Sequence, residues 1–469
     1  MTEEKSTVEM KKEALFYKRQ NAAKALSAEA QAAADAFCEG YKAFLDAGKT
    51  EREAAAFLVS RAKERGFSEF DPKRRYESGD RVYLCNRGKA VVLAVLGEQP
   101  LEAGLRLTAA HIDSPRLDLK PNPLYEADEL ALFKTHYYGG IKKYQWTSLP
   151  LALHGVVVRR DGEAVPVCIG ERDDEPRFVV TDLLPHLANE QMKRTLADGV
   201  RGEELNVLVG SRPFADDEAS ELVKLNILDL LFQKYGVTEA DFLSAELEVV
   251  PAFRACDIGL DRSMIGAYGH DDRVCAYPAA EALFAIEGTP VHTAVAVLTD
   301  KEEIGSDGNT GLNSAYLRHF LTDLCLARGE NVRIALSNTK SLSADVTAAF
   351  DPTFPDAYER ANAAFLNRGV ALMKYSGARG KSGTSDASAE YMAWVRRTLD
   401  DAGVYWQCAE LGKVDAGGGG TVAMFLAAQD IDVVDVGVPV LSMHAPFEVV
   451  SKLDVYMTYQ ACAAFYARF

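Results

Sequence analysis

The sequence lacks any apolar run long enough to cross a bilayer. Its longest runs, such as Ala90–Leu96, fall well short of the roughly 20 residues that a spanning helix needs. The opening segment, MTEEKSTVEMKKEALFYKRQ, is charged throughout and lacks the apolar core of a signal peptide. We therefore expect no membrane partner and a cytoplasmic location.

The sequence also lacks closely spaced cysteines and an excess of basic residues. Its eight cysteines are scattered over 469 residues with no Cys-x-x-Cys pair, which argues against a disulfide framework or a zinc knuckle and predicts reduced thiols. The 52 Lys and Arg residues face 69 Asp and Glu residues, giving a formal net charge of -17. Because such a surface repels polyanions, we expect no nucleic-acid partner.

What is present is apolar sequence with two kinds of periodicity, enough for two domains. Residues from about 12 to 66 have apolar positions at helical spacing and are predicted to be helical. Later runs predict strands: Val82–Asn86, Ala90–Leu96, Leu105–Ile112, Val291–Leu298, Val332–Ser337 and Asp432–Val436. Helices are expected at Ser385–Asp400 and from about Glu448. This alternation predicts an α/β catalytic domain with a mixed, mostly parallel sheet flanked by helices.

The stretch 121–250 differs from its surroundings. Runs such as Leu153–Arg159 and Val165–Ile169 are separated by Gly, Pro and charged turns. These patterns predict a β-rich module inserted into the larger domain. The larger domain would then comprise residues 1–120 and 251–469.

Several polar segments follow or flank the predicted strands, where ligands bind in open α/β sheets. In Ala110-His111-Ile112-Asp113, residues two apart point the same way in an extended chain, so His111 could ligate a metal while Asp113 orients its ring. Taken alone, a His-x-Asp triplet is more often an ordinary strand-end turn.

Acidic pairs form the next two segments. Asp271 and Asp272 are adjacent, and keeping both charged in a confined site needs a nearby cation. Glu302 and Glu303 follow a stretch without polar side chains, so one can bind metal while the other acts as a general base. For both pairs the commoner alternative is a solvated acidic turn.

Asp345 and His444 complete the set, each after a predicted strand, although a lone residue of this kind is more often a helix cap or a satisfied core residue. Together the segments supply imidazole and carboxylate ligands of the kind that suit zinc, manganese or cobalt. A bridging carboxylate can hold two such ions about 3.5–4 Å apart.

The segments AHIDSPRLDLKP, DDRV, TDKEEIGSDGNTG, SADV and SMHAPFE occur in the order found in the aspartyl aminopeptidase and aminopeptidase I family of metallopeptidases, which the sequence resembles over nearly its whole length. The resemblance implies that His111, Asp271 and Asp345 hold one metal. It implies that Asp271, Glu303 and His444 hold the other, with Asp271 bridging. Two divalent ions are implied, zinc first, with manganese or cobalt as alternatives.

The resemblance also implies roles for residues that hold no metal. Glu302 would be the general base and Asp113 would orient His111. The peptide bond after Asp271 would be cis, as in related enzymes. The inserted β-rich module would be a dimerisation domain, and twelve subunits would assemble from dimers into a tetrahedral homododecamer. The segment Leu184-Pro185-His186-Leu187-Ala188 resembles one whose histidine enters a neighbouring subunit's active site, a role carried to His186.

Two segments bear on substrate choice. The stretches YYGGIKKYQWTSLPLALHG and KYSGARGKSGTSDAS depart from the acidic-substrate members and look more like the bacterial aminopeptidase I branch. Lys374 is a candidate for binding a substrate carboxylate, but nearby Asp386 can oppose it, so the preferred first residue stays open between acidic and neutral or hydrophobic. The run Gly417–Gly420 is not a Walker loop and is interpreted as a tight turn close to the substrate.

The expected activity is therefore the release of N-terminal amino acids from peptides by two-metal hydrolysis. The alternatives are a two-metal carboxypeptidase or deacylase on the same scaffold, and an inactive oligomeric binding protein. The first would need a group that captures a substrate carboxylate, and the second would not need to retain Glu302 and His444.

Overall fold

A computed structural model describes residues 6–17, 19–215 and 219–468. Residues 1–5, 18 and 469 of the predicted larger domain, and residues 216–218 of the predicted insert, lie outside the described residues. Within the described residues, no helix is both long and apolar enough to cross a membrane.

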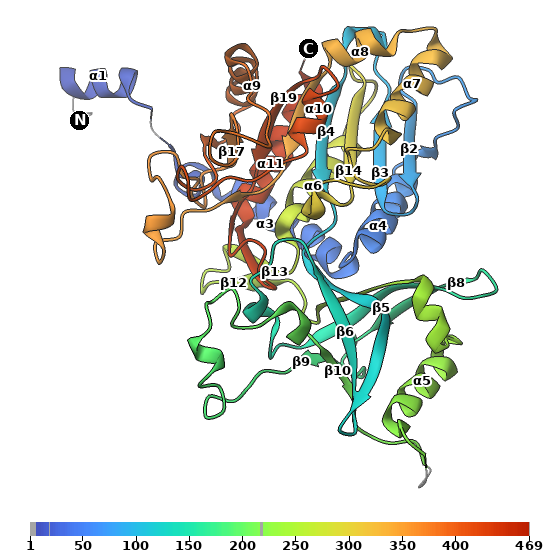
Figure 1. The fold of residues 1–469 in the computed structure, drawn as a ribbon. Coiled ribbons are helices and arrows are strands. Elements are labelled where there is room, and N and C mark those ends of the chain that lie inside the picture. The colour runs from blue at the N-terminus through green and yellow to red at the C-terminus, as the bar shows by residue number, and fades with distance from the viewer. Residues whose placement is uncertain (1–5, 18, 216–218, 469) are drawn as a thin grey trace.

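A nine-stranded sheet forms the centre of the upper half of the molecule (Figure 1). Its parallel pairs outnumber its antiparallel pairs, so the predicted mixed, mostly parallel sheet is confirmed. In order across the sheet, the strands are β1 (Ser68–Glu69), β2 (Arg81–Asn86), β3 (Ala90–Val95), β14 (Ala294–Thr299), β4 (Arg106–His111), β15 (Lys340–Ala344), β19 (Asp432–Gly437), β17 (Val370–Met373) and β18 (Trp406–Cys408).

The helices lie on both faces of this sheet, apart from α1 and α5 (Figure 1). Alternate residues of a strand point to opposite faces, so a fully apolar strand such as β3 needs cover on both. Val91 and Leu93 join one core cluster, whereas Val92 and Ala94 join another. The described helices are α1 (Thr7–Leu15), α2 (Ala22–Ala25), α3 (Ala28–Ala47), α4 (Glu51–Glu64), α5 (Leu222–Tyr235), α6 (His270–Phe284), α7 (Tyr316–Arg328), α8 (Val332–Asn338), α9 (Ala389–Asp401), α10 (Ala423–Ala427) and α11 (Lys452–Ala467).

A seven-stranded antiparallel sheet and α5 make up the lower half (Figure 1). It has its own core around Trp146, which is fully buried. In order across it, the strands are β8 (Ala164–Ile169), β7 (Leu151–Val158), β11 (Ala245–Pro251), β5 (Arg116–Ala127), β6 (Leu130–Tyr138), β10 (Val207–Gly210) and β9 (Val179–Val180).

A five-stranded sheet lies between these two halves (Figure 1). In order across it, the strands are β12 (Cys256–Ile258), β13 (Met264–Ala267), β21 (Glu448–Ser451), β20 (Pro439–Leu441) and β16 (Thr347–Ala348). Strands β13 and β21 flank the segments that carry Asp271 and His444, so this small sheet holds both segments near the end of the large one.

Two predicted elements are wrong. Val332–Ser337 is not a strand but belongs to helix α8, which Asn331 caps by accepting a hydrogen bond from the backbone N–H of Arg333. A short apolar run does not distinguish the two states by periodicity alone. The helix expected from about Glu448 begins at Lys452, because Glu448–Ser451 pairs with β13 as a strand.

Candidate metal centre

Three neighbouring strands end at the same edge of the nine-stranded sheet. Strand β4 lies between β14 and β15 and runs parallel to both, so their carboxyl ends come together. His111 is the last residue of β4, Asp345 follows β15, and Glu302 and Glu303 follow β14. The fold thus brings four of the predicted residues to one place.

Asp271 joins this group from α6 and has the most central position. It lies in the first turn of the helix with non-helical dihedral angles, and its peptide bond to Asp272 is cis, as expected. Its Oδ1 lies 3.1 Å from Nε2 of His111, and its Oδ2 lies 3.1 Å from Nε2 of His444. The two oxygens of one carboxylate therefore face two different imidazoles.

Two groups of potential ligands share this aspartate. His111, Asp271 and Asp345 each place a ligand atom within 4.8 Å of the other two, and so do Asp271, Glu303 and His444. Asp345 lies 3.9 Å from Nε2 of His111, and Glu303 lies 3.7 Å from Nε2 of His444. The structure brings together all five residues predicted as ligands.

Asp113 contacts both the imidazole and the acidic loop. Its Oδ1 lies 3.2 Å from Nδ1 of His111 and accepts a hydrogen bond from the backbone N–H of Glu302 at 3.2 Å. Its Oδ2 accepts hydrogen bonds from the backbone N–H of Glu303 at 3.2 Å and from the hydroxyl of Tyr138 at 2.7 Å. The backbone carbonyl of Asp113 also accepts a hydrogen bond of 3.0 Å from Nδ1 of His111, so this residue holds the ring through its backbone and side chain and holds the acidic loop through its carboxylate.

Glu448 has a similar position on the other side, which the sequence analysis missed. It accepts hydrogen bonds from the backbone N–H of Asp271 at 3.1 Å and from that of His444 at 2.7 Å. It is buried. The available signal was a glutamate within the apolar segment from Phe447 to Val450, four residues after His444.

A pair of glycines also brings backbone into the site. Gly139 has a φ of +74°, and a Cβ there would lie 3.0 Å from Glu303 Oε2. The carbonyl of Gly140 accepts a hydrogen bond of 2.7 Å from Nδ1 of His444. A larger residue at Gly139 would be strained and would approach Glu303 closely, so this glycine is part of the site rather than of a generic turn.

The charges of the site fit a bound cation. Burial raises the pKa of Glu303 and Asp345 well above the usual range, and that of Glu302 to about 7. Among the described residues, no Lys or Arg forms an ion pair with Asp271 or with these three acids, and the buried Oε1 of Glu303 has no hydrogen-bond partner. Imidazole and carboxylate donors of this kind suit zinc, so the residues fit the metal that the sequence predicts.

The remaining predicted residues lie elsewhere or are already paired. His186 is exposed, and no contact joins it to the five ligands within the described chain. Lys374 forms an ion pair with Asp386, as the sequence analysis allowed. Gly418 has a φ of +106° and packs against the backbone of Ala378, in the loop that follows Lys374.

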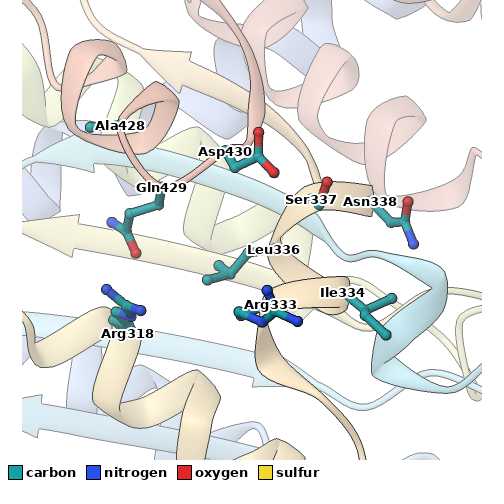
Figure 2. Close-up of a pocket in the computed structure, with 9 residues that line it drawn as sticks. All are labelled: Arg318, Arg333, Ile334, Leu336, Ser337, Asn338, Ala428, Gln429 and Asp430. Carbon is teal, nitrogen blue, oxygen red and sulfur yellow. The ribbon is translucent and has the colours of Figure 1, made fainter.

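A surface hollow of about 480 Å³ lies apart from this cluster (Figure 2). Asn338 borders it just before β15 begins, whereas Asp345 follows the end of that strand. The hollow is therefore at the opposite edge of the sheet and contains none of the predicted site residues. Its lining residues are Arg318, Arg333, Ile334, Leu336, Ser337, Asn338, Ala428, Gln429 and Asp430.

The α/β fold and the paired ligand groups define the class of metal-dependent hydrolases with carboxylate and imidazole ligands. Comparison with known sequences identifies the family within this class. A profile described as "Aminopeptidase I zinc metalloprotease (M18)" matches residues 44–466. A protein of Clostridium acetobutylicum called "Probable M18 family aminopeptidase 1" is 48% identical over 433 residues, which cover 91% of this chain and 93% of the relative.

Comparison with solved structures gives the same family. A crystal structure of an M18-family aminopeptidase from Thermotoga maritima superimposes with a TM-score of 0.91 and 43% identity, covering 97% of this chain and 100% of that one. A structure of the S. cerevisiae mApe1 dodecamer has a TM-score of 0.74 at 20% identity, covering 92% of this chain and 96% of that one, and shows the shared fold. The chain belongs to the M18 family of aminopeptidase I zinc metalloproteases, and its function is that of a zinc aminopeptidase.

Proposed function

We propose that the protein releases N-terminal amino acids from peptides by hydrolysis at a centre of two divalent ions. The observation that carries the proposal is Asp271, whose two carboxylate oxygens each lie 3.1 Å from a different histidine. A shared carboxylate of this kind suits a two-ion centre. His111, Asp271 and Asp345 would hold one ion, and Asp271, Glu303 and His444 the other. Zinc is the proposed metal, with manganese and cobalt as alternatives.

When bound, such ions activate water as a nucleophile and polarise the scissile carbonyl. The chain's own acid–base group in this proposal is Glu302, which accepts a proton from the attacking water and delivers it to the leaving amine. The exposed fractions of the two glutamate side chains support these different roles, with Glu302 as the base and Glu303 as a metal ligand. The side chain of Glu302 is 18% exposed, while that of Glu303 is 3% exposed and faces His444.

Asp113 is proposed as the positioning residue. It holds Nδ1 of His111, so that Nε2 faces the ligand group, and it holds the backbone of Glu302. The base and one ligand are thus oriented by the same carboxylate. Loss of this carboxylate would misplace both.

The wider assembly belongs to the same proposal. We propose that residues 121–250 form an inserted dimerisation domain between catalytic parts 1–120 and 251–469, and that dimers build a tetrahedral dodecamer. The mApe1 dodecamer of a distant relative supports the oligomer. The exposure of His186 is compatible with a role in a neighbouring subunit's site. The eight unpaired cysteines support a reducing, cytoplasmic location.

Lys374 is proposed to border the pocket for the first residue of the substrate. Its charge is partly offset by Asp386, a carboxylate that it shares with Lys381, which lies 3.1 Å away. A lysine paired with a carboxylate attracts a substrate carboxylate less strongly than a free one. A strict preference for Asp or Glu is therefore not expected.

The test is a panel of aminoacyl-4-nitroanilides, acidic and neutral, assayed after chelation and after addition of zinc, manganese or cobalt. Hydrolysis that is lost with chelator and restored by a metal is expected. Matched peptides with free and acetylated amino termini then separate the activities. Cleavage of acetylated peptides at equal rates would favour the carboxypeptidase or deacylase alternative, and no metal-dependent cleavage would favour an inactive binding protein.

A further inference from the structure

A second cluster of metal-ligating side chains lies where α4 meets the seven-stranded sheet. Glu53 of α4 and His154 and Cys168 of the neighbouring strands β7 and β8 each place a ligand atom within 4.8 Å of the other two. No residue of this cluster belongs to the metal centre described above. The zinc peptidase reaction assigns it no role.

His154 is the centre of the cluster. It is 2% exposed, and its ring lies between two carboxylates: Nδ1 donates to Glu53 at 2.8 Å and Nε2 donates to Glu171 at 3.0 Å. Burial disfavours the charged ring, but the hydrogen bonds with Cys168, Glu171 and Glu53 outweigh burial and raise the pKa of His154 to about 11. Carboxylates that accept hydrogen bonds from an imidazole in this way also orient the ring for a metal.

The sulfur of Cys168 lies on the Nε2 side of the ring, 4.0 Å away. In a tetrahedral zinc site, bonds of about 2.0–2.1 Å to nitrogen and 2.3 Å to sulfur place these two atoms about 3.6 Å apart. The atoms are thus within a few tenths of an ångström of ligand spacing. Glu53 supplies the carboxylate oxygen, within 4.8 Å of a ligand atom of each of the other two residues.

The charges around the His154 ring also suit a bound divalent ion. Lys49 donates to Glu171 at 2.7 Å and to the carbonyls of Pro251 and Phe253 at 2.8 Å and 3.0 Å, so Glu171 is already paired. Glu53 and Glu171 place carboxylate oxygens 2.8 Å and 3.0 Å from the two nitrogens of this ring, so the chain already holds negative charge beside a bound divalent ion. This lowers the main cost of placing an ion at a partly buried site.

We propose that Glu53 of α4, His154 of β7 and Cys168 of β8 form a separate transition-metal site, for zinc or cobalt, that joins α4 to the two strands. The thiol of Cys168 is exposed, so the ion can enter from solvent. The ion binds the folded chain across the two elements and therefore stabilises their junction. The site does not depend on how many ions the metal centre holds.

Cobalt(II) tests the proposal because a thiolate ligand adds a near-ultraviolet charge-transfer band that imidazole and carboxylate ligands do not produce. Metal-free full-length protein is titrated with cobalt(II). The native protein is expected to bind one more ion per chain than the metal centre holds, and the band is expected to grow with that ion. Cys168→Ser is expected to lose both the band and the extra ion. Cys256→Ser, at another exposed thiol, is the matched control and is expected to keep both.

Glu53→Gln supplies a second measurement. Glu53 also forms a capping box with Thr50 at the start of α4, and glutamine preserves a capping box while removing the charge. Helix α4 is expected to persist. The affinity for cobalt, measured from the growth of the thiolate band during titration, is expected to fall about 10–100-fold. A native protein without a thiolate band, or a band that survives in Cys168→Ser, would overturn the proposal.

Discussion

His111 and His154 are buried in the same manner but in opposite electrostatic settings. Each ring lies between two carboxylates: Asp113 and Asp271 for His111, and Glu53 and Glu171 for His154. The distances are alike, between 2.8 Å and 3.2 Å. A buried histidine held by two acids is therefore not in itself a sign of a catalytic metal.

The difference lies in the surrounding charges. Beside His154, Lys49 lies 2.7 Å from Glu171, so the chain supplies its own cations. Beside His111, Glu302 and Asp345 add further acids, and no Lys or Arg among the described residues forms an ion pair with them. The acids around His154 are balanced in part by a lysine of the chain itself, whereas the acids around His111 need a bound cation to stay charged together.

The strongest way to test this contrast is to remove the shared aspartate. Asp271→Asn is expected to lose both catalytic ions and with them all detectable peptidase activity, because each group of ligands depends on that carboxylate. The matched change in the other cluster, Glu171→Gln, is expected to leave activity and catalytic metal content near native. Elemental analysis and nitroanilide assays measure both. Equal loss of catalytic metal in the two variants would remove the contrast.

Substitutions at Glu302 and Glu303 distinguish the proposed general base from the acids proposed to bind metal. Glu302→Gln is expected to lower kcat by about 10²–10⁴-fold, the contribution typical of general acid–base catalysis, with metal content unchanged. Glu303→Gln is the control and is expected to lose metal, because Glu303 is one of the ligand group with His444. Native rates for Glu302→Gln would exclude Glu302 as the base.

Local pattern drew attention to the segments of the five ligand candidates, because each follows or flanks a strand or helix end where polar residues interrupt apolar runs. The resemblance to the aminopeptidase I family then implied that these five are the ligands. It did not predict Glu448, Gly139 or Tyr138. These contact the site from segments whose approach depends on how three sheets pack, which no local pattern encodes. The misassigned strand at Val332–Ser337 had no effect on Asp345, because β15 directly precedes that residue in its place.

A substitution at Tyr138 tests how much the residues behind the metal ligands contribute to metal binding and activity. The hydroxyl of Tyr138 donates to Asp113 at 2.7 Å, so Tyr138→Phe leaves the ligands intact but removes one of the two hydrogen bonds to Oδ2 of the carboxylate beside His111, the other coming from the backbone N–H of Glu303. Metal affinity or kcat/KM is expected to fall about 10-fold, the lower end for residues behind a ligand. Tyr137→Phe, at the exposed neighbour, is expected to change neither. Native affinity and rates in Tyr138→Phe would mean that the other contacts of Asp113 suffice.

The smallest expected effect comes from an acid that is fully paired by the chain. Asp257 lies 2.9 Å from Lys42, 3.1 Å from Lys452 and 2.8 Å from Arg262, and these hydrogen bonds overcome burial to hold its pKa below the usual range. A lowered folded-state pKa contributes stability above the unfolded value of about 3.9, and that stability is lost as the pH falls below it.

Asp257→Asn is therefore expected to cost about 1–2 kcal/mol in the free energy of unfolding at pH 7. The difference from the native protein should narrow as the pH falls below about 4, because the carboxyl of the unfolded chain then takes up a proton while the folded carboxyl, whose pKa is lower, stays charged until the pH falls further. Denaturant unfolding across this pH range measures both, with the fully exposed Asp173→Asn as the control. Since Asp257 faces the chain's own cations, added zinc should not change the difference in stability between the native protein and Asp257→Asn at any pH. A zinc-dependent difference would place Asp257 with the metal-requiring acids instead.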